Sequence, residues 1–353
     1  MRKSLLRLAL VAAVSTLTLA AAAPLSAAPP DGSYTVTNLV SDVPGAATLP
    51  DPNLVNGWGL ARSATSPWWV ADNGMDKSTL YISNGTTISI NPLVVGVDGG
   101  PTGAIFAGIP MNFIVSGGPA AFVFASEDGM IRAWRGGLTS ALVTAHGGTD
   151  AVYKGLAIAQ TGTGPVLYAT DFHNAHVDVF NGAWQNVTPQ GSFVDPMIPD
   201  GYGPFGIQVI GNRVFVSYAK QDADAHDDVA GQSLGFVDAY DLSGDLLTRV
   251  AQHGQLNSPW GLALAPPSFG RFAGDLLVGN FGDGQINAYE ETSAGFEHRG
   301  TLRDASGGKL VIDGLWALQF GNAGSNGNPD TLFFTAGPDG ESHGLFGTIK
   351  PAG

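Results

Sequence analysis

Three runs of sequence decide the fold: SPWGLALA (258–265), DLLVGNFGDG (275–284) and QINAYE (285–290). Each is a short apolar run bounded by Gly, Asp, Asn or Pro, which is the pattern of β-strands joined by tight turns. The pattern recurs five more times, beginning at NGWGLA (56–61), PTGAIFA (101–107), YKGLAIA (153–159), GPFGIQV (203–209) and DGLWALQF (313–320). Matching Gly57, 103, 155, 206, 261 and 314 gives a period near fifty residues, typical of a β-propeller blade. We therefore predict an all-β, six-bladed β-propeller.

The first and last repeats predict how the ring closes. The sixth repeat has no outer strand, because the chain ends soon after its third run, GLFGTI. The run YTVTNLV (34–40) stands before the first repeat and can supply that strand. Closure by the N-terminal strand would remove an open sheet edge. A degenerate β-sandwich is the alternative fold.

The N-terminus resembles a secretory leader. Arg2, Lys3 and Arg7 precede an apolar run from Leu8 to Ala23, and small residues follow. We predict a signal peptide over residues 1–27, cleaved between Ala27 and Ala28, and one propeller domain over residues 28–353. The mature protein is then secreted, with no membrane anchor.

Composition limits the partners. The formal net charge of −14 argues against binding nucleic acid or anionic membranes and favours solubility or cation binding. The chain has no Cys, so it forms no disulfide. We expect a monomer.

Six polar turns should meet at one mouth of the channel. They are ADNG (71–74), SEDG (126–129), TDFHN (170–174), AKQDADAHDD (219–228), GNFGDG (279–284) and AGPDGESHG (336–344). Each joins the second and third strands of its blade, and these turns lie on the face where the innermost strands begin. Loops on a rigid scaffold are common binding sites.

The acidic turns suggest metal ligands. Asp72, Asp171 and Asn280 end equivalent second strands, and Asp222 and Asp224 alternate like the opening ligands of calcium loops. We predict these five as candidate ligands of Ca²⁺ or another divalent cation. The alternatives are turn capping for the first three and a disordered acidic loop for the others. The chain contains no EF-hand, zinc or phosphate-loop spacing.

Other polar and aromatic side chains complete the predicted site. His173, His226 and His343 are candidate proton-transfer groups, since histidine titrates near neutrality. We predict Lys220, Trp58, Phe281 and Glu341 as ligand contacts. Core packing is the alternative for Trp58, as it is for Trp260 and Trp316.

Five runs carry a resemblance to a known family: AKQDADAHDDVAG, LNSPWGLALAP, LLVGNFGDGQINAY, IDGLWALQFGN and AGPDGESHGLFG. They resemble a family of exported bacterial propeller proteins without an assigned activity. More distantly, the repeats are similar to NHL-repeat proteins and to gluconolactonase and streptogramin-lyase propellers. That likeness implies a divalent cation at the channel mouth, held by acidic and amide side chains from different blades.

Two functions fit these observations. The first is a secreted binding module whose mouth holds a cation, a small molecule, a glycan, or the end of an extracellular polymer or protein. The second is a metal-dependent hydrolase or lyase, lactonase-like in its use of the same face, with a histidine moving a proton. A purely structural envelope component is a third possibility. The fold alone does not choose among them.

Overall fold

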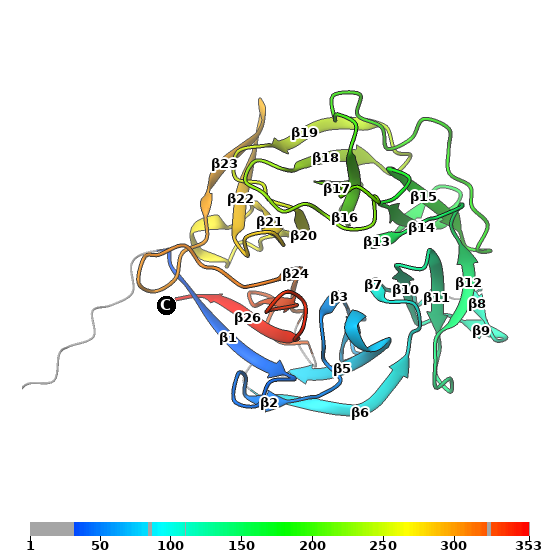
Figure 1. Ribbon diagram of the computed structural model, residues 1–353, viewed down its shortest axis with the longest axis horizontal. Helices are drawn as coiled ribbons and strands as arrows, with labels where there is room; N and C mark the ends of the chain where they lie inside the picture. Colours follow the sequence, from blue (N-terminus) through cyan, green and yellow to red (C-terminus); the bar gives the residue numbers. More distant parts are fainter. Residues whose placement is uncertain (1–31, 84–86, 110, 323–325, 353) are drawn as a thin grey trace, which may run out of the picture.

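The computed structural model describes residues 32–83, 87–109, 111–322 and 326–352, which form a ring of six blades (Figure 1). The predicted six-bladed β-propeller is confirmed, and the described residues contain no α-helix. Among them, no helix has the length and apolar character needed to cross a membrane. The predicted leader and its cleavage site lie outside the described residues.

Each blade is an antiparallel sheet whose first strand lies nearest the ring centre. Blade 1 contains β3 (Gly57–Ala61), β4 (Trp68–Asp72), β5 (Lys77–Ser83) and β6 (Ile88–Gly96). Blade 2 contains β7 (Pro101–Phe106), β10 (Phe122–Ser126), β11 (Met130–Trp134) and β12 (Leu142–His146). Blade 3 contains β13 (Tyr153–Thr161), β14 (Gly164–Asp171) and β15 (His176–Asn181). Blade 4 contains β16 (Tyr202–Ile210), β17 (Arg213–Lys220), β18 (Phe236–Asp241) and β19 (Leu246–Gln252). Blade 5 contains β20 (Pro259–Leu264), β21 (Leu276–Asn280), β22 (Ile286–Thr292) and β23 (Gly295–Thr301). Blade 6 contains β24 (Leu315–Phe320), β25 (Leu332–Ala336), β26 (Leu345–Pro351) and β1 (Tyr34–Ser41).

Short elements decorate the ring. The strand β2 (Leu49–Pro50) runs parallel to β1 at the edge of blade 6. A two-stranded hairpin, β8 (Ile114–Val115) with β9 (Gly118–Pro119), is inserted in blade 2. Two 3₁₀ turns, η1 (Asn73–Met75) and η2 (Gly270–Phe272), follow β4 and precede β21.

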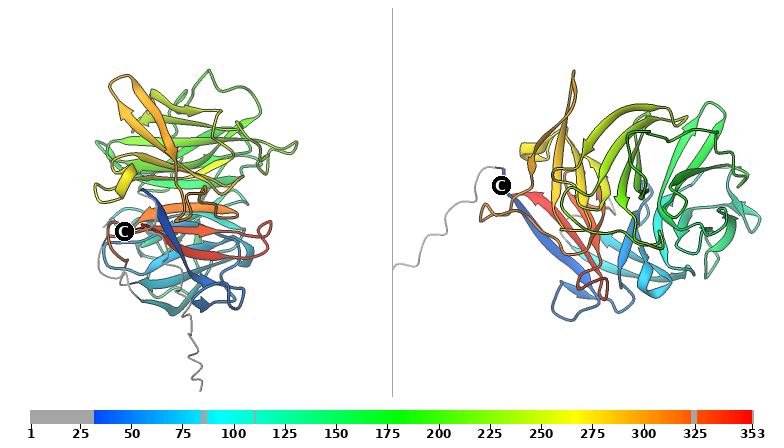
Figure 2. Two further views of the ribbon diagram at one scale, coloured as in Figure 1. Left: turned by 90° about the vertical axis from the view of Figure 1, so that its left-hand side faces the viewer. Right: turned by 45° about the horizontal axis from the view of Figure 1, so that its top comes forward.

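The N-terminal strand closes the ring as predicted. Strand β1 pairs antiparallel with β26 from Tyr34, opposite Pro351, to Ser41, opposite Leu345. Figure 2 shows the two strands side by side, one from each end of the chain. Closure gives β26 a partner on its outer side, and the sheet of blade 6 has the order β2-β1-β26-β25-β24.

Inner strands of neighbouring blades approach closely at one small residue in each repeat. A Cβ at Gly59 would lie 2.3 Å from the Thr102 carbonyl oxygen, and one at Gly206 would lie 2.0 Å from that of Trp260. A side chain at these two glycines would clash with the backbone of the next blade, whereas blade 6 carries an alanine at this position. The equivalent residues are Gly59, Gly103, Gly155, Gly206, Gly261 and Ala317.

These equivalent residues correct the predicted alignment of the first and last repeats. Gly57 and Gly314 were matched to the glycines of the other four blades, but Gly59 and Ala317 hold the equivalent positions. A Cβ at Gly57 would meet the side chains of Leu54 and Val70 within blade 1. The first repeat has a second glycine two residues away, and the sixth has an alanine at the equivalent position, so the pattern of glycines alone misaligns both.

Hydroxyl groups tie neighbouring blades together. Thr170 Oγ1, on the second strand of blade 3, donates to the Phe205 carbonyl in blade 4 at 2.8 Å. Ser217 Oγ of blade 4 donates to the Pro259 carbonyl in blade 5 at 2.6 Å, and Thr335 of blade 6 donates to the Trp58 carbonyl in blade 1. Each hydroxyl also accepts from the amide of its own blade's repeated small residue. These buried bonds join blades that could not bury their faces alone.

An aromatic cluster fills the mouth end of the channel. The Trp58 and Trp316 rings stack with centroids 3.6 Å apart, and Trp260 packs edge-on against both. Trp58 of blade 1 also contacts Phe205 of blade 4, so the rings meet across the ring of blades. All three tryptophans are buried, as the core-packing alternative expects.

Candidate functional site

A lysine interrupts the aromatic cluster. The residue just before the repeated small residue is aromatic in four blades, namely Trp58, Phe205, Trp260 and Trp316. In blade 3 the same position is Lys154, which is only 1% exposed. Its Nζ lies 5.1 Å from the centroid of the Trp58 ring, within reach of a cation–π interaction. The fold therefore brings a buried positive charge to the mouth end of the channel.

Two carboxylates bind this ammonium group. Lys154 Nζ donates to Glu127 Oε1 at 2.5 Å and to Asp227 Oδ1 at 3.2 Å. Glu127 lies in the turn between β10 and β11, whereas Asp227 lies in the long loop between β17 and β18. The Glu127 side chain is 21% exposed and that of Asp227 is 66% exposed, so solvent weakens the second pair.

Amide side chains extend the cluster to blades 1 and 6. Asn73 Nδ2 donates to Glu127 Oε2 at 2.9 Å. Asn56 Nδ2 donates to Glu341 Oε2 at 2.6 Å and to Asn73 Oδ1 at 3.2 Å. We call Asn56, Asn73, Glu127, Lys154, Asp227 and Glu341 the mouth network.

The aromatic cluster supports this network from below. Trp316 Nε1 donates to Asn56 Oδ1 at 3.0 Å, which fixes the orientation of the Asn56 amide. Phe281 of blade 5 stacks on Trp316 with centroids 3.9 Å apart. Side chains from all six blades thus take part in one continuous structure at the mouth.

The carboxylates outnumber the cation. Glu127 and Asp227 contact Lys154, and the charges of Asp228 and Glu341 interact with it. Burial acts to raise the pKa of Asp227, but the charges and hydrogen bonds of Lys154 and His226 together outweigh it and hold that pKa below its usual range. Burial raises the pKa of Glu341; the hydrogen bond from Asn56 opposes this, and the Glu127 charge adds to it. Burial also raises the pKa of Asp228. Raised carboxylate pKa values in a cluster of this kind are characteristic of functional sites.

The long loop of blade 4 is folded over the mouth. The Asp222 amide donates to the Asp227 carbonyl at 2.9 Å, and the His226 amide donates to Asp222 Oδ1 at 2.9 Å. Gln221 Nε2 donates to the Phe172 carbonyl at 2.5 Å, anchoring the loop on blade 3. These bonds place the Asp227 carboxylate against Lys154. The alternative of a disordered acidic loop is therefore wrong.

Other residues predicted in this loop take different positions. Asp222 accepts a hydrogen bond inside the loop, and Asp224 is exposed. Lys220 is exposed at the end of β17. His226 joins the edge of the mouth network, with Nδ1 at 2.9 Å from Asp227 Oδ1.

The three residues that end second strands are held by hydrogen bonds within the protein. Asp72 Oδ1 accepts from Thr79 Oγ1 in the same blade at 3.2 Å. Asp171 Oδ1 accepts from the Asn174 amide at 3.1 Å, and Asn280 Nδ2 donates to the Gln255 carbonyl at 2.7 Å. All three are fully buried. Asp171 and Asn280 make turn contacts, as the capping alternative expects, whereas Asp72 makes no capping bond to the turn that follows it. A shared role in metal binding stays a prediction.

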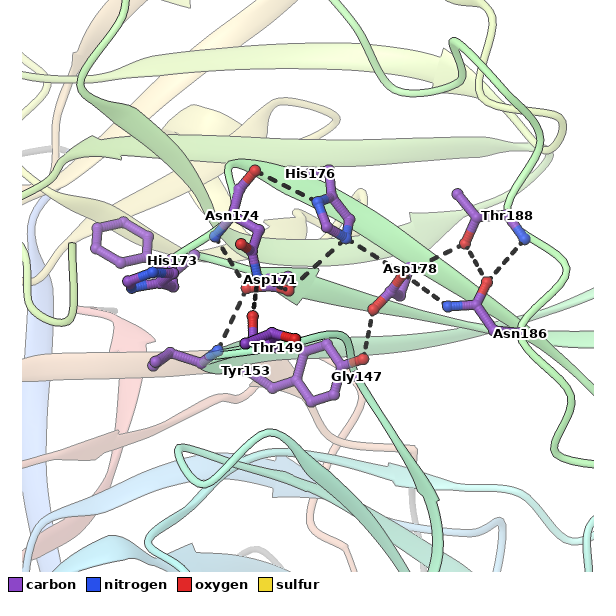
Figure 3. A network of polar contacts seen from close by, with 12 residues as sticks. Gly147, Thr149, Tyr153, Asp171, His173, Asn174, His176, Asp178, Asn186 and Thr188 are labelled. Carbon is purple, nitrogen blue, oxygen red and sulfur yellow. Dashed lines mark hydrogen bonds and ion pairs between the residues drawn. The ribbon is translucent and has the colours of Figure 1, made fainter.

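The remaining predicted residues divide between the mouth and other places. Trp58, Phe281 and Glu341 belong to the mouth, as described above. His173 is half-buried, and Figure 3 shows its ring to one side of the polar contacts of blade 3. His343 lies beside the ring closure, where its Nδ1 is 2.8 Å from Asp42 Oδ2. The hydrogen bond with Asp42 raises the pKa of His343.

Sequence reasoning missed five members of the mouth network. Glu127 and Asp227 lie in turns that were singled out, but neither was chosen. Asn56, Asn73 and Lys154 were not considered. One feature of the sequence could have revealed the mouth network: Lys154 is a lysine at the position where four other repeats carry a tryptophan or phenylalanine.

Comparisons with known proteins give relatives without a known function. No family model matches the chain. Uncharacterized protein R648 of Acanthamoeba polyphaga mimivirus is 31% identical over 334 residues, covering 90% of this chain and 80% of the viral protein. Uncharacterized protein L690 of the same virus is 31% identical over 344 residues, covering 90% and 86%. These relatives are viral, and they do not show the bacterial family that the sequence resembles.

Solved structures share the fold at low identity. An aldose sugar dehydrogenase from Escherichia coli has a TM-score of 0.55 at 11% identity, covering 90% of this chain and all of that one. Streptogramin B lyase has a TM-score of 0.52 at 10% identity, covering 92% and 99%. A gluconolactonase from Xanthomonas campestris covers 65% of this chain and 81% of that one, at 16% identity and a TM-score of 0.41, too low to support an inference. These likenesses show the propeller fold alone.

Proposed function

The chain belongs to the family of the uncharacterised mimivirus proteins R648 and L690, and we propose that it is a ligand-binding propeller. Its mouth network would bind a cationic group, such as an ammonium or guanidinium, on a small molecule or at the end of a polymer. The proposal includes export of the protein by its N-terminal leader. Secretion would place the mouth in contact with extracellular ligands.

One observation carries the proposal: two carboxylates bind the Lys154 ammonium at the mouth, and two more interact with its charge. Formal charges of Glu127, Asp227, Asp228 and Glu341 exceed that of Lys154 by three. Burial and mutual repulsion make this excess negative charge unfavourable, and a bound cation would relieve it. Phe281, half-buried and stacked on Trp316, offers an aromatic surface beside the carboxylates.

The same geometry weighs against a metal-dependent hydrolase at this position. Glu127, His226 and Asp227 each offer a donor atom, and these atoms lie within 4.8 Å of one another. However, the Lys154 ammonium already bridges the two carboxylates. A divalent cation would have to displace Lys154 from a buried position, so we favour the binding function.

A ligand panel tests the proposal. Thermal unfolding of the protein would be followed with putrescine, arginine and glucosamine, and with glycerol and glucose as neutral compounds. We expect the cationic compounds to raise the melting temperature and the neutral ones to have no effect. The shift should disappear in Glu127→Gln/Glu341→Gln.

Glu291→Gln is the matched control, because Glu291 forms a surface ion pair with Arg213 on the outer strands. It should respond to cations as the wild type does. Equal shifts in all three proteins would mean non-specific binding to an acidic surface. No shift with any cationic compound would also reject the proposal.

A further inference from the structure

A second cluster of titratable side chains lies in blade 3. Asp171 ends β14, and His176 and Asp178 lie two residues apart at the start of β15, where their side chains share one face of the strand. Figure 3 shows the three side chains directed toward one another. We call them the blade-3 triad. Its members belong to neither the mouth network nor its hydrogen bonds.

The histidine presents a lone pair to two carboxylates. His176 Nδ1 lies 3.3 Å from the Asn174 carbonyl oxygen, which can only accept, so Nδ1 carries the proton. In the neutral ring, Nε2 is then an acceptor. It faces Asp171 Oδ2 and Asp178 Oδ1, which are acceptors as well. Three acceptors directed at one point require a cation between them, either a second proton on the ring or a metal ion.

The distances fit a metal ion: the three ligand atoms lie within 4.8 Å of one another. His176 Nε2 lies 3.3 Å from Asp178 Oδ1 and 3.7 Å from Asp171 Oδ2. A charge-assisted hydrogen bond would measure about 2.7–2.9 Å. Two ligands at about 2.0–2.2 Å from a tetrahedral zinc ion are instead roughly 3.4 Å apart.

Other histidines of the same molecule provide the comparison. His343 Nδ1 lies 2.8 Å from Asp42 Oδ2, and His226 Nδ1 lies 2.9 Å from Asp227 Oδ1. Both are ordinary hydrogen bonds between a histidine and a carboxylate. The longer separations in the blade-3 triad are therefore particular to that site.

Surrounding donors hold the carboxylates in place. Tyr153 Oη donates to Asp178 Oδ2 at 2.5 Å, and Asn186 Nδ2 donates to Asp178 Oδ1 at 2.8 Å. Asn174 Nδ2 donates to Asp171 Oδ2 at 2.8 Å. The Asp171 and Asp178 residues are 0% and 4% exposed. Buried ligands oriented by a second layer of hydrogen bonds are characteristic of metal sites.

We propose that Asp171, His176 and Asp178 bind a divalent transition-metal ion. The ligands are His176 Nε2 and one oxygen from each carboxylate. Imidazole and carboxylate together suit Zn²⁺. The His176 side chain is 45% exposed, so the ion can enter from solvent and keep a water molecule as a further ligand.

Zinc titration of the chelator-treated protein by calorimetry tests this site. We expect one Zn²⁺ per chain, with affinity at least tenfold weaker in His176→Ala and in Asp178→Asn. His226→Ala and His343→Ala are the matched controls, since each removes a histidine that is hydrogen-bonded to a carboxylate. Both should bind Zn²⁺ as the wild type does. Circular dichroism would confirm that each variant is folded.

Cobalt provides a second readout that does not depend on affinity alone. Co²⁺ bound to the wild type should show the intense visible absorption of a tetrahedral site, and His176→Ala should lose it. The proposal is overturned if the wild type binds neither ion. It is also overturned if binding survives in His176→Ala, or is lost in His226→Ala instead.

Discussion

The mouth network and the blade-3 triad both place carboxylates near a histidine, but the negative charge of the carboxylates is balanced differently in the two clusters. In the mouth network, Lys154 lies at 2.5 Å from Glu127 and 3.2 Å from Asp227. In the triad, no Lys or Arg of the described residues pairs with Asp171 or Asp178, and the cation is either a protonated His176 or a bound metal ion. The first cluster carries a lysine as its counter-ion, whereas the proposed metal ion would be the counter-ion of the second. A geometric group of potential metal ligands therefore says little until the nearest cationic side chain is known.

Removing the counter-ion should have the largest effect. In Lys154→Met the Glu127 and Asp227 carboxylates face each other without compensation. We expect a loss of about 3 kcal/mol in the free energy of unfolding, at the low end for a broken buried pair because Asp227 is largely exposed. Urea unfolding measures this loss.

The same variant would make the mouth network resemble the triad. Divalent cations should stabilise Lys154→Met and leave the mouth of the wild type unaffected. The triple variant Lys154→Met/Glu127→Gln/Asp227→Asn should recover most of the lost stability. A loss below about 1 kcal/mol in Lys154→Met would mean that the ion pair is solvent-screened.

Removing a hydroxyl that donates to one of the proposed ligands should have an intermediate effect, which falls on zinc affinity. Tyr153→Phe removes the hydroxyl that donates to Asp178 Oδ2 and leaves all three proposed ligands in place. We expect zinc affinity to fall by roughly tenfold, the lower end for an outer-shell partner. Calorimetry measures the change, and Tyr81→Phe is the control because the Tyr81 hydroxyl bonds to Asp51 in blade 1. Equal affinity in Tyr153→Phe and wild type would show that the hydroxyl does not orient a metal ligand.

The two clusters also differ in how far sequence could predict them. Repeat length, turn chemistry and the displaced strand YTVTNLV were sufficient for the fold and its closure. The convergence of six polar turns followed from that fold. Lys154 was missed because it lies on an inner strand beside a small residue. Its role appears only once the Trp58 ring and the two carboxylates are placed around it.

The triad was hard to predict for another reason. Asp171 was chosen by its position at a strand end, but its partners were expected in other blades. The structure instead brings it to His176 and Asp178 in its own blade, two strand residues on one face. Spacing of two in a strand is common, so the motif HVD (176–178) has little specificity until Asp171 and Tyr153 are placed beside it.

The effect of pH on ligand binding at the mouth should be smaller than the effects predicted for Lys154→Met and Tyr153→Phe. Because the pKa of Glu341 and that of Asp228 are raised, both carboxylates gain their charge at a higher pH than an exposed carboxylate. Putrescine binding should therefore strengthen as pH rises through these values, by about threefold for each carboxylate, the scale of a partly exposed ion pair. Titrations at several pH values measure this trend, and Glu341→Gln should show a smaller one. Affinity that falls with rising pH would contradict a cationic ligand.

The smallest expected effect tests the histidine used as the reference distance. His343 and Asp42 form a half-exposed pair beside the ring closure, and Asp42 Oδ1 also accepts from the Gly344 amide at 2.8 Å. The pKa of His343 is raised in the folded protein, so its protonated form stabilises the fold. That contribution is complete below the unfolded value of about 6.5 and is lost as pH rises through the folded value.

His343→Asn should therefore melt slightly below the wild type near pH 5 and equally well near pH 9. Asp42→Asn should reproduce the loss at low pH. Zinc should change the difference between wild type and His343→Asn at neither pH, because a pair at 2.8 Å has no room for a metal ion between its atoms. A zinc-dependent difference would remove His343 as the reference and weaken the distance argument for the triad.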